Sequence, residues 1–315
     1  MAQATMGSPI KKVYGETASL TTTALHLGFT PDYHEVLMYC TSNWRMGIAP
    51  KLACVKYYNG STYTDYTSYA TDRSSSTHIP LDGMTSAHYL YLGVTAPTRG
   101  FYSTVGSNVQ DVAATLDMEY MYDVSDGSYL KLTGTLSAGF TVGETVNQAT
   151  SLASAVVVYS GSGYITVKTV TGSISISYTL TGASSGSTCS ALTAIAPVAV
   201  GTGYFTDVAN DVDGTNSVAD TLKISGLYAF DLPSVVRGAL AGISNQPLYW
   251  YRFAPSTTLT NPTDIAELWP ACDTTNYAYM EGGISYQFAL NTAMCGAFEF
   301  DHTSTGTLDI SWIQH

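Results

Sequence analysis

Short runs of alternating apolar and polar residues dominate the hydrophobic pattern of the chain. In residues 116–122 every second position is apolar, and Asp117 and Glu119 lie between these positions. Residues 248–253 are mainly apolar on both faces, as in a central strand of a sandwich. The alternation recurs in 286–290 and 308–312. Many short strands separated by turn signals predict an all-β fold of antiparallel β-sandwich or jelly-roll domains.

Helical spacing is confined to two short stretches of the chain. Residues 233–240 and 262–268 each have room for a turn or two of helix. The second stretch opens with Asn261-Pro262, which suits an N-cap followed by the first helical position. We therefore expect helix to contribute little to the fold.

The stretch from Thr135 to Ala196 is rich in Ser, Thr, Gly, Val and Ile, and Glu144 and Lys168 are its only charged residues. It also repeats itself, because FTVGETVNQATS (140–151) aligns with ISISYTLTGASS (174–185) 34 residues later. The apolar positions keep their phase in both copies: Phe140, Val142 and Val146, then Ile174, Ile176 and Leu180. Residues 135–200 are therefore predicted to form a small β-domain built from a duplicated hairpin.

The aromatic-rich sequence resumes on both sides of this repeat. Loop tips tolerate insertions, so the repeat is predicted to be inserted into a larger β-sandwich formed by 50–134 and 201–271. Chain termini often lie close together. Residues 1–49 and 272–315 are accordingly predicted to pair as a terminal β-domain.

Charge and polarity exclude some classes of binding partner for this chain of 315 residues. The net charge is −12, and only 11% of residues are charged, so polar surface must come largely from Ser, Thr, Asn and 24 tyrosines. Such a surface costs little to desolvate against neighbouring proteins. We expect no nucleic-acid or anionic-membrane partner, because a basic stripe is missing from the sequence. The N-terminal residues lack an apolar signal region and no apolar run approaches a membrane span, which predicts synthesis in a cytoplasm without export.

Signatures of catalysis and cofactor binding are missing from the sequence. We find no P-loop, no dinucleotide fingerprint following a strand and no H-E-x-x-H motif, and the six histidines never pair at ligand spacing. We therefore expect no enzyme and no cofactor, although a triad assembled from distant residues stays open. The five cysteines lack C-x-x-C spacing and are predicted to be buried free thiols.

One acidic loop has partial calcium-site character. Asp211 and Asp213 precede Gly214 as in the middle of a calcium loop, and Asp220 falls at the closing ligand position. However, Ala209 occupies the first ligand position, and Asp-Gly also makes ordinary turns. We favour a turn without metal and keep a weak calcium site at these three aspartates as the alternative.

A tyrosine cluster in YYNGSTYTDYTSY is the candidate binding surface: Tyr57, Tyr58, Tyr63, Tyr66 and Tyr69. Large rigid side chains with a polar tip suit subunit interfaces, which is the preferred interpretation. Stacking on sugar rings of a host glycan is the alternative. Asn59-Gly60-Ser61 matches a glycosylation sequon, and we interpret it instead as a hairpin turn.

Several phrases of the sequence resemble proteins of tailed-bacteriophage particles. FTVGETV…ATS resembles the F-x-x-G-E-x-V-x-G-x-T-S-G modules of phage virion proteins, and its second copy has Ser177-Tyr178 in place of Gly-Glu. The segments 88–97, 113–123, 213–215, 230–234 and 247–259 look like a β-sandwich module of phage head and tail proteins, and 27–33 resembles the opening of head-associated proteins. The resemblance touches roughly half of the chain. It implies a repetitive, assembling role without chemistry.

The sequence thus predicts a non-enzymatic virion structural protein, most consistent with a capsid-associated decoration or head fibre protein. It would be assembled in the host cytoplasm, form homo-oligomers and pack against other capsid or tail subunits. Alternatives are a tail or baseplate component and a receptor- or glycan-binding tip that uses the tyrosine cluster. A depolymerase would normally show a long β-helix repeat and paired carboxylates, neither of which the sequence contains.

Overall fold

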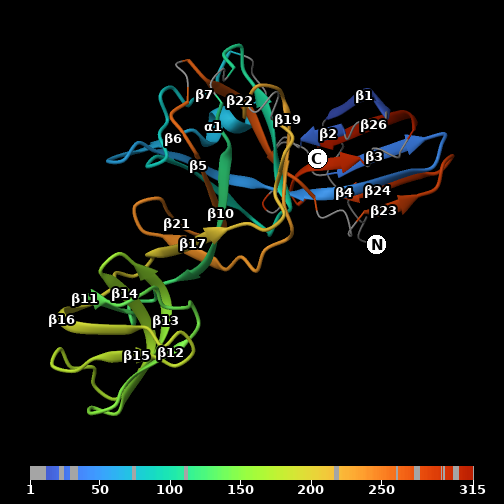
Figure 1. The fold of residues 1–315 in the computed structure, drawn as a ribbon. Coiled ribbons are helices and arrows are strands. Elements are labelled where there is room, and N and C mark those ends of the chain that lie inside the picture. Colours follow the sequence, from blue (N-terminus) through green and yellow to red (C-terminus); the bar gives the residue numbers. More distant parts are fainter. Residues whose placement is uncertain are drawn as a thin grey trace, which may run out of the picture. The chain divides into compact units, whose positions relative to one another are not determined.

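The computed structural model is nearly all β (Figure 1). Strands make up 57% of the chain and helix 2%, and the sheets are antiparallel, so the prediction of an all-β, sandwich-like fold is confirmed. The structure describes residues 12–20, 25–28, 35–72, 76–109, 113–215, 220–259, 262–272, 277–291, 293, 295–300 and 305–314.

The chain divides into two compact units. The first comprises Met1–Glu119, Asp207–Pro233 and Leu248–His315, and the second comprises Tyr120–Thr206 and Ser234–Pro247. Both units are therefore assembled from segments that are distant in the sequence.

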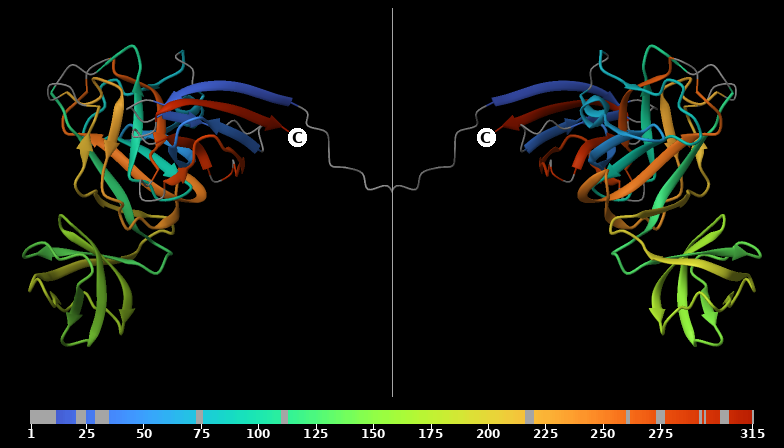
Figure 2. Two further views of the ribbon diagram at one scale, coloured as in Figure 1. Left: turned by 90° about the vertical axis from the view of Figure 1, so that its right-hand side faces the viewer. Right: turned by 90° about the vertical axis from the view of Figure 1, so that its left-hand side faces the viewer.

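Strands from the two ends of the chain form a sandwich in the first unit. One sheet has the order β1 (Lys12–Leu20), β26 (Gly306–Gln314), β3 (Glu35–Cys40) and β24 (Ser285–Ala289), and β1 and β26 lie side by side in both views of Figure 2. The other has the order β2 (Leu25–Gly28), β25 (Cys295–Phe300), β4 (Trp44–Pro50) and β23 (Ala278–Met280). Residues 29–33 of the phrase LGFTPDY lie outside the described residues.

Alternation places one side chain in two from each sheet into a shared core. Trp312 of β26 lies against Phe298 of β25, with ring centroids 6.2 Å apart, and Trp44 of β4 packs 5.8 Å from Phe300. Leu308, Ile310 and Trp312, the alternating residues of β26, are all buried there. Burial of these large side chains holds the two ends of the chain together, since each contributes roughly 1.5–3 kcal/mol.

Two further sheets form around the middle of the chain. One has the order β17 (Gly203–Asp207), β10 (Leu116–Val124), β21 (Ser244–Pro255), β8 (Tyr89–Val94), β5 (Leu52–Tyr58) and β6 (Tyr63–Asp65), and β20 (Arg237–Leu240) also pairs with β21. The second has the order β18 (Val212–Asp213), β19 (Gly226–Ala229), β9 (Gly100–Val105), β22 (Asp264–Pro270) and β7 (Ile79–Pro80). In the first unit the sheets meet where Tyr251 of β21 packs edge-on against Phe101 of β9, 5.3 Å away.

The structure overturns the helical predictions. Residues 237–240 form β20, and 264–270 form β22, while Asn261 lies outside the described residues. Both segments pair with neighbouring strands, and those ladder hydrogen bonds outweigh the local preference for a helical turn. The only helix among the described residues is α1 (Thr67–Thr71).

Alternation predicted β10 correctly only in its first half. Leu116 and Met118 are buried and Asp117 is exposed, as expected. Beyond Glu119 the buried position shifts to Met121, and Tyr120 and Tyr122 are half-buried. The change of phase coincides with the boundary between the two units, which falls between Glu119 and Tyr120.

A closed six-stranded barrel forms the main part of the second unit (Figure 1). Its order is β11 (Leu130–Leu136), β14 (Tyr164–Thr171), β13 (Ala153–Gly161), β12 (Thr145–Gln148), β15 (Leu180–Gly182) and β16 (Thr188–Pro197), and β16 pairs back with β11. Closure leaves every strand paired on both sides. Its core includes Leu132, Val146, Ile165 and Leu180, all fully buried.

The 34-residue repeat of the sequence is also a repeat of the structure. The strands β11, β12 and β13 correspond to β14, β15 and β16, and the ladder pair Val146↔Ala155 recurs 34 residues later as Leu180↔Cys189. The two copies interleave around the barrel, because β12 pairs with β15, β13 pairs with β14, and β11 pairs with both β14 and β16. Exchange of the two copies therefore leaves the order of strands around the barrel unchanged, so the barrel has internal two-fold pseudosymmetry.

Strand formation begins later in each copy than alternation indicates. Val142 and Ile176 lie in turns and are 50% and 55% exposed, whereas Val146 and Leu180 are buried in β12 and β15. The middle apolar position of each repeat is thus a turn residue.

Candidate functional site

The tyrosine cluster begins in the hairpin of β5 and β6. Asn59 and Gly60 form its turn, with the Asn59 side chain accepting hydrogen bonds from the backbone N–H groups of Ser61 and Thr62. Gly60 adopts φ +89°, a conformation that glycine tolerates without strain. The interpretation of Asn59-Gly60-Ser61 as a hairpin turn is therefore confirmed.

The alternation of β5 separates Tyr57 from Tyr58. Tyr58 pairs directly with Tyr63 across the hairpin, and their rings are 4.8 Å apart. Tyr57 faces the other way, where its hydroxyl lies 3.0 Å from Nδ1 of His88. The cluster that is continuous in the sequence is thus divided between two faces of one sheet.

The face that carries Tyr58 and Tyr63 continues as an aromatic ladder. The Tyr63 ring lies 6.0 Å from that of Tyr91, and Tyr91 lies 6.0 Å from Tyr89. The guanidinium of Arg252 stacks 3.9 Å from the centre of the Tyr89 ring. Sequence analysis missed the residues of β8 and β21 because they join the ladder only through strand pairing.

Arg252 is tied to this ladder by charge as well as by stacking. Its Nε lies 2.5 Å from a carboxylate oxygen of Glu119, and its terminal nitrogen donates to the Tyr91 hydroxyl at 3.2 Å. Burial opposes the charge of Arg252, but the hydrogen bond and attraction to Glu119 raise its pKa above the usual range. Arg252, Glu119 and Tyr91 thus meet one another's charge and hydrogen-bonding requirements, so the ladder is a packed and stable part of the surface.

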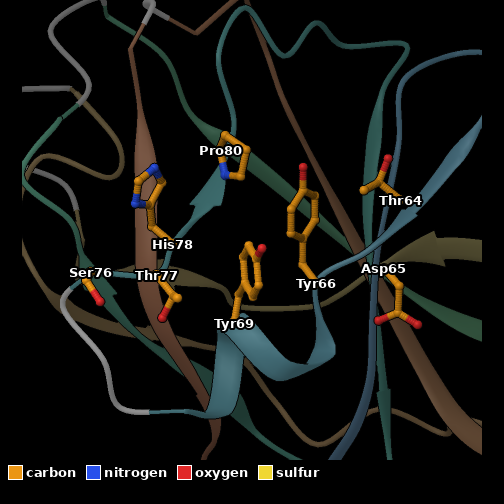
Figure 3. A pocket seen from close by; sticks show the side chains of 8 residues that line it. All are labelled: Thr64, Asp65, Tyr66, Tyr69, Ser76, Thr77, His78 and Pro80. Atoms are coloured by element: carbon orange, nitrogen blue, oxygen red, sulfur yellow. The ribbon is translucent and has the colours of Figure 1, made fainter.

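On the opposite face, Tyr66 and Tyr69 line a cleft of about 460 Å³ (Figure 3). The two rings lie three residues apart around α1 and project to the same side of it, with centroids 5.6 Å apart. Residues that precede and include β7 complete the wall. The lining consists of Thr64, Asp65, Tyr66, Tyr69, Ser76, Thr77, His78 and Pro80.

Hydrogen bonds to β5 fix the wall that carries the tyrosines. The Tyr66 N–H donates to the carbonyl of Val55 at 2.9 Å, and the Val55 N–H donates to the Thr67 hydroxyl at 2.9 Å. The buried methyl group of Ala70 anchors the helical turn. The aromatic side chains are therefore presented by a backbone that is already held in place.

The opposite wall is held by β7. Ile79 is fully buried and pairs with Ile265 of β22, and the Thr77 hydroxyl donates to Asp72 at 2.5 Å. His78 stands exposed between them, with Nε2 3.8 Å from a carboxylate oxygen of Asp264. Burial, with contributions from Tyr69 and Asp82, raises the pKa of Tyr66, so its hydroxyl stays protonated at neutral pH and can donate.

The three aspartates of the calcium alternative have separate partners. Asp213 accepts from the backbone and hydroxyl of Thr215 and from Thr221. Asp211 accepts from the Tyr228 hydroxyl, and Asp220 lies 3.9 Å from Lys223. Residues 216–219 of this loop lie outside the described residues. Within the described part of the chain, no three His, Cys, Asp or Glu side chains are placed to hold a metal ion.

The glutamate of the repeat motif has a folding role that sequence reasoning missed. The buried Glu144 carboxylate accepts from the N–H of Thr141 at 2.7 Å and from the N–H groups of Ser184 and Ser185 at 3.1 and 3.0 Å. Burial opposes its charge, but these donors and the two serine hydroxyls outweigh that effect and lower its pKa to about 2. Glu144 thereby joins a turn of the first copy to a turn of the second.

The five cysteines are free, and all but Cys295 are buried. Burial raises the pKa of the Cys54 thiol to about 11, with Asp65 adding to the effect. Cys40, Cys54, Cys189 and Cys272 are buried as small apolar residues, as the sequence predicts, whereas Cys295 is only partly buried.

No family model, curated protein or solved structure matches this chain. Among the helices of the described residues, none has the length and apolar character needed to cross a membrane.

Proposed function

We propose that this chain is a non-enzymatic structural protein of a tailed-bacteriophage-type particle, a capsid-associated decoration or head fibre protein that packs against neighbouring subunits. The observation that carries the proposal is the composition of its surface. Only 11% of the residues are charged, yet large apolar side chains are exposed, including Leu152 at 83% and Tyr279 at 64%. Removal of water from such a surface costs little free energy, even over a broad contact area.

The position of Tyr279 strengthens the case for packing between subunits. It lies in β23, a three-residue strand at the edge of its sheet, which pairs only with β4 among the described strands. An edge strand offers unpaired backbone groups that a neighbouring subunit can complete. Self-association into a homo-oligomer and contact with capsid subunits would both use surfaces of this kind.

The repeat motif supports the same proposal in a different way. Its resemblance to virion modules rests on F-x-x-G-E-x-V, and Phe140 and Glu144 of this motif are both buried in the barrel. The motif therefore serves folding of a module rather than chemistry. Modules of this type suit a protein that is present in many copies in a particle, because each copy of the module must fold by itself before assembly.

Electron microscopy of particles assembled with and without this protein tests the proposal. We expect particles without it to lack a defined density of 33.5 kDa per copy on the head. A missing density on the tail or baseplate would relocate the protein within the particle. Unchanged particles, or turnover of host polysaccharide by the purified chain, would contradict a purely structural role.

A further inference from the structure

The tyrosine cluster contains two surfaces of different character: one is a packed aromatic ladder and the other borders a cleft. Tyr58 and Tyr63 belong to the packed aromatic ladder, whereas Tyr66 and Tyr69 open onto the cleft between α1 and β7. We propose that this cleft is a binding site for a neutral saccharide. The inference concerns a site of its own and does not rest on the role in particle assembly.

The size and shape of the cleft suit a small ligand. Its volume of about 460 Å³ falls within the roughly 300–1,000 Å³ of small-molecule pockets. Figure 3 shows the rings of Tyr66, Tyr69 and His78 arranged around one opening, with the ring of Pro80 beside them. The C–H faces of a pyranose stack on aromatic rings in such an arrangement, because these faces are apolar while the rim of the sugar is polar.

Polar groups surround the rings at the edge of the cleft. Thr64, Ser76 and Thr77 contribute hydroxyl groups, and Asp65 contributes a carboxylate that accepts hydrogen bonds. The protonated Tyr66 hydroxyl adds a donor. Sugar hydroxyls both donate and accept, so this mixture of apolar rings and polar rim matches a saccharide better than an apolar ligand.

Among the described residues around the cleft, carboxylates predominate over basic side chains, which disfavours acidic sugars. Asp65 lines it, Asp72 holds Thr77 of the wall, and the charge of Asp82 acts on Tyr66. Lys56 lies 3.8 Å from Asp65 and offsets that carboxylate in part. An added carboxylate on the ligand would meet repulsion from these groups, whereas a neutral sugar would not.

Both walls are already fixed in the absence of ligand. The tyrosine wall is bonded to Val55 and the other wall is paired with β22. Binding therefore requires little ordering of the protein, which lowers its entropic cost.

A glycan array carrying neutral and acidic oligosaccharides tests the proposal with the full chain, followed by titration of the strongest neutral glycan. We expect Tyr69→Ala to weaken binding by about tenfold or more, as removal of a stacking side chain does. Tyr63→Ala is the matched control, because Tyr63 and Tyr69 are 40% and 41% exposed but lie on different faces. This control should bind within about twofold of the original chain.

The Tyr66→Phe variant separates a binding effect from a folding effect, because it retains the ring and removes only one hydroxyl. We expect it to bind several-fold more weakly while its thermal unfolding matches that of the original chain. Binding of acidic glycans alone, equal losses for Tyr63→Ala and Tyr69→Ala, or absence of any neutral glycan ligand would overturn the proposal. Unchanged particles in the absence of this protein, together with neutral-glycan binding by the purified chain, would contradict only the structural function.

Discussion

Glu144 illustrates how a single side chain organises the barrel. Its carboxylate accepts hydrogen bonds from two turns that are far apart in sequence, one in each copy of the repeat. The second copy has Tyr178 at the matching position, and its turn is held by a different side chain. There, Gln148 of the first copy donates to the carbonyls of Ser175 and Tyr178 at 2.7 and 2.8 Å. In both places a side chain of the first copy thus holds a turn of the second.

Replacement of Glu144 should destabilise the second unit. Glu144→Gln replaces one carboxylate oxygen with an NH2 group that cannot accept, so donors on that side lose a charged acceptor, and we expect a loss of about 1.5–3 kcal/mol. Urea denaturation at pH 7, with hydrogen exchange of the barrel amides, measures the loss. Glu281→Gln is a suitable control because Glu281 is exposed in the first unit, and it should change stability by less than about 0.5 kcal/mol.

The same residue predicts a dependence of stability on pH. Its pKa is lowered from 4.5 to about 2 in the folded protein, so its contribution is complete above pH 4.5 and is lost as the pH falls towards 2. The difference in unfolding free energy between the original chain and Glu144→Gln should therefore shrink between pH 5 and pH 2. A difference that stays constant over this range would show that the ionised carboxylate is not the stabilising species.

At the scale of strands, the 34-residue duplication determines the barrel. Matching strands occupy matching places, and each copy alone presents edges that only the other copy pairs. The pairing of β12 with β15 together with the closing pair of β16 with β11 explains why two copies suffice here, since a closed barrel needs no further repeat to cover an exposed end.

Equivalent strand positions should respond alike to mutation. Leu180→Ala should cost about 2–4 kcal/mol and Val146→Ala somewhat less, because each removes fully buried methyl groups from the shared core. Val142→Ser and Ile176→Ser, at exposed turn positions of the same repeats, should change stability by less than about 0.5 kcal/mol. Chemical denaturation of the four variants checks the pattern, and a large cost at the turn positions would contradict the assigned register.

At the scale of the whole molecule, the barrel is an insertion that contacts β10 of the second unit through the Tyr122 hydroxyl on the Val158 carbonyl and the Lys168–Asp123 ion pair. It leaves and rejoins the chain at neighbouring points, since the Val198 N–H donates to the Tyr129 carbonyl at 2.8 Å. The tryptophans Trp44, Trp250, Trp269 and Trp312 all belong to the first unit. Their fluorescence therefore reports on that unit separately.

Deletion of residues 130–197, with a short glycine linker between Tyr129 and Val198, should leave the first unit folded. Its cores draw on residues outside the barrel, so we expect the tryptophan-detected melting temperature to stay within about 4 °C of the original. Fluorescence thermal scans of both proteins provide the measurement. Loss of the cooperative transition after deletion would mean that the barrel supports folding of the rest.

Much of the fold was accessible from the sequence because alternation is a local property. It placed β21 and β26 and the hairpin at Asn59-Gly60 correctly. It failed where tertiary pairing overrides local preference, as in β20 and β22, and where the buried phase shifts at Met121. The sequence also identified the tyrosine cluster, but it treated five side chains as one surface.

By itself, the sequence determined the all-β class, the internal repeat and the weakly charged surface, since each follows from the identity and local order of residues. Only the tertiary structure decided that the repeat closes into a barrel and that Tyr58 and Tyr63 are separated from Tyr66 and Tyr69. The physical reason is that strand pairing joins residues distant in sequence, so the face on which a side chain lies and the residues beside it depend on register and on neighbouring strands.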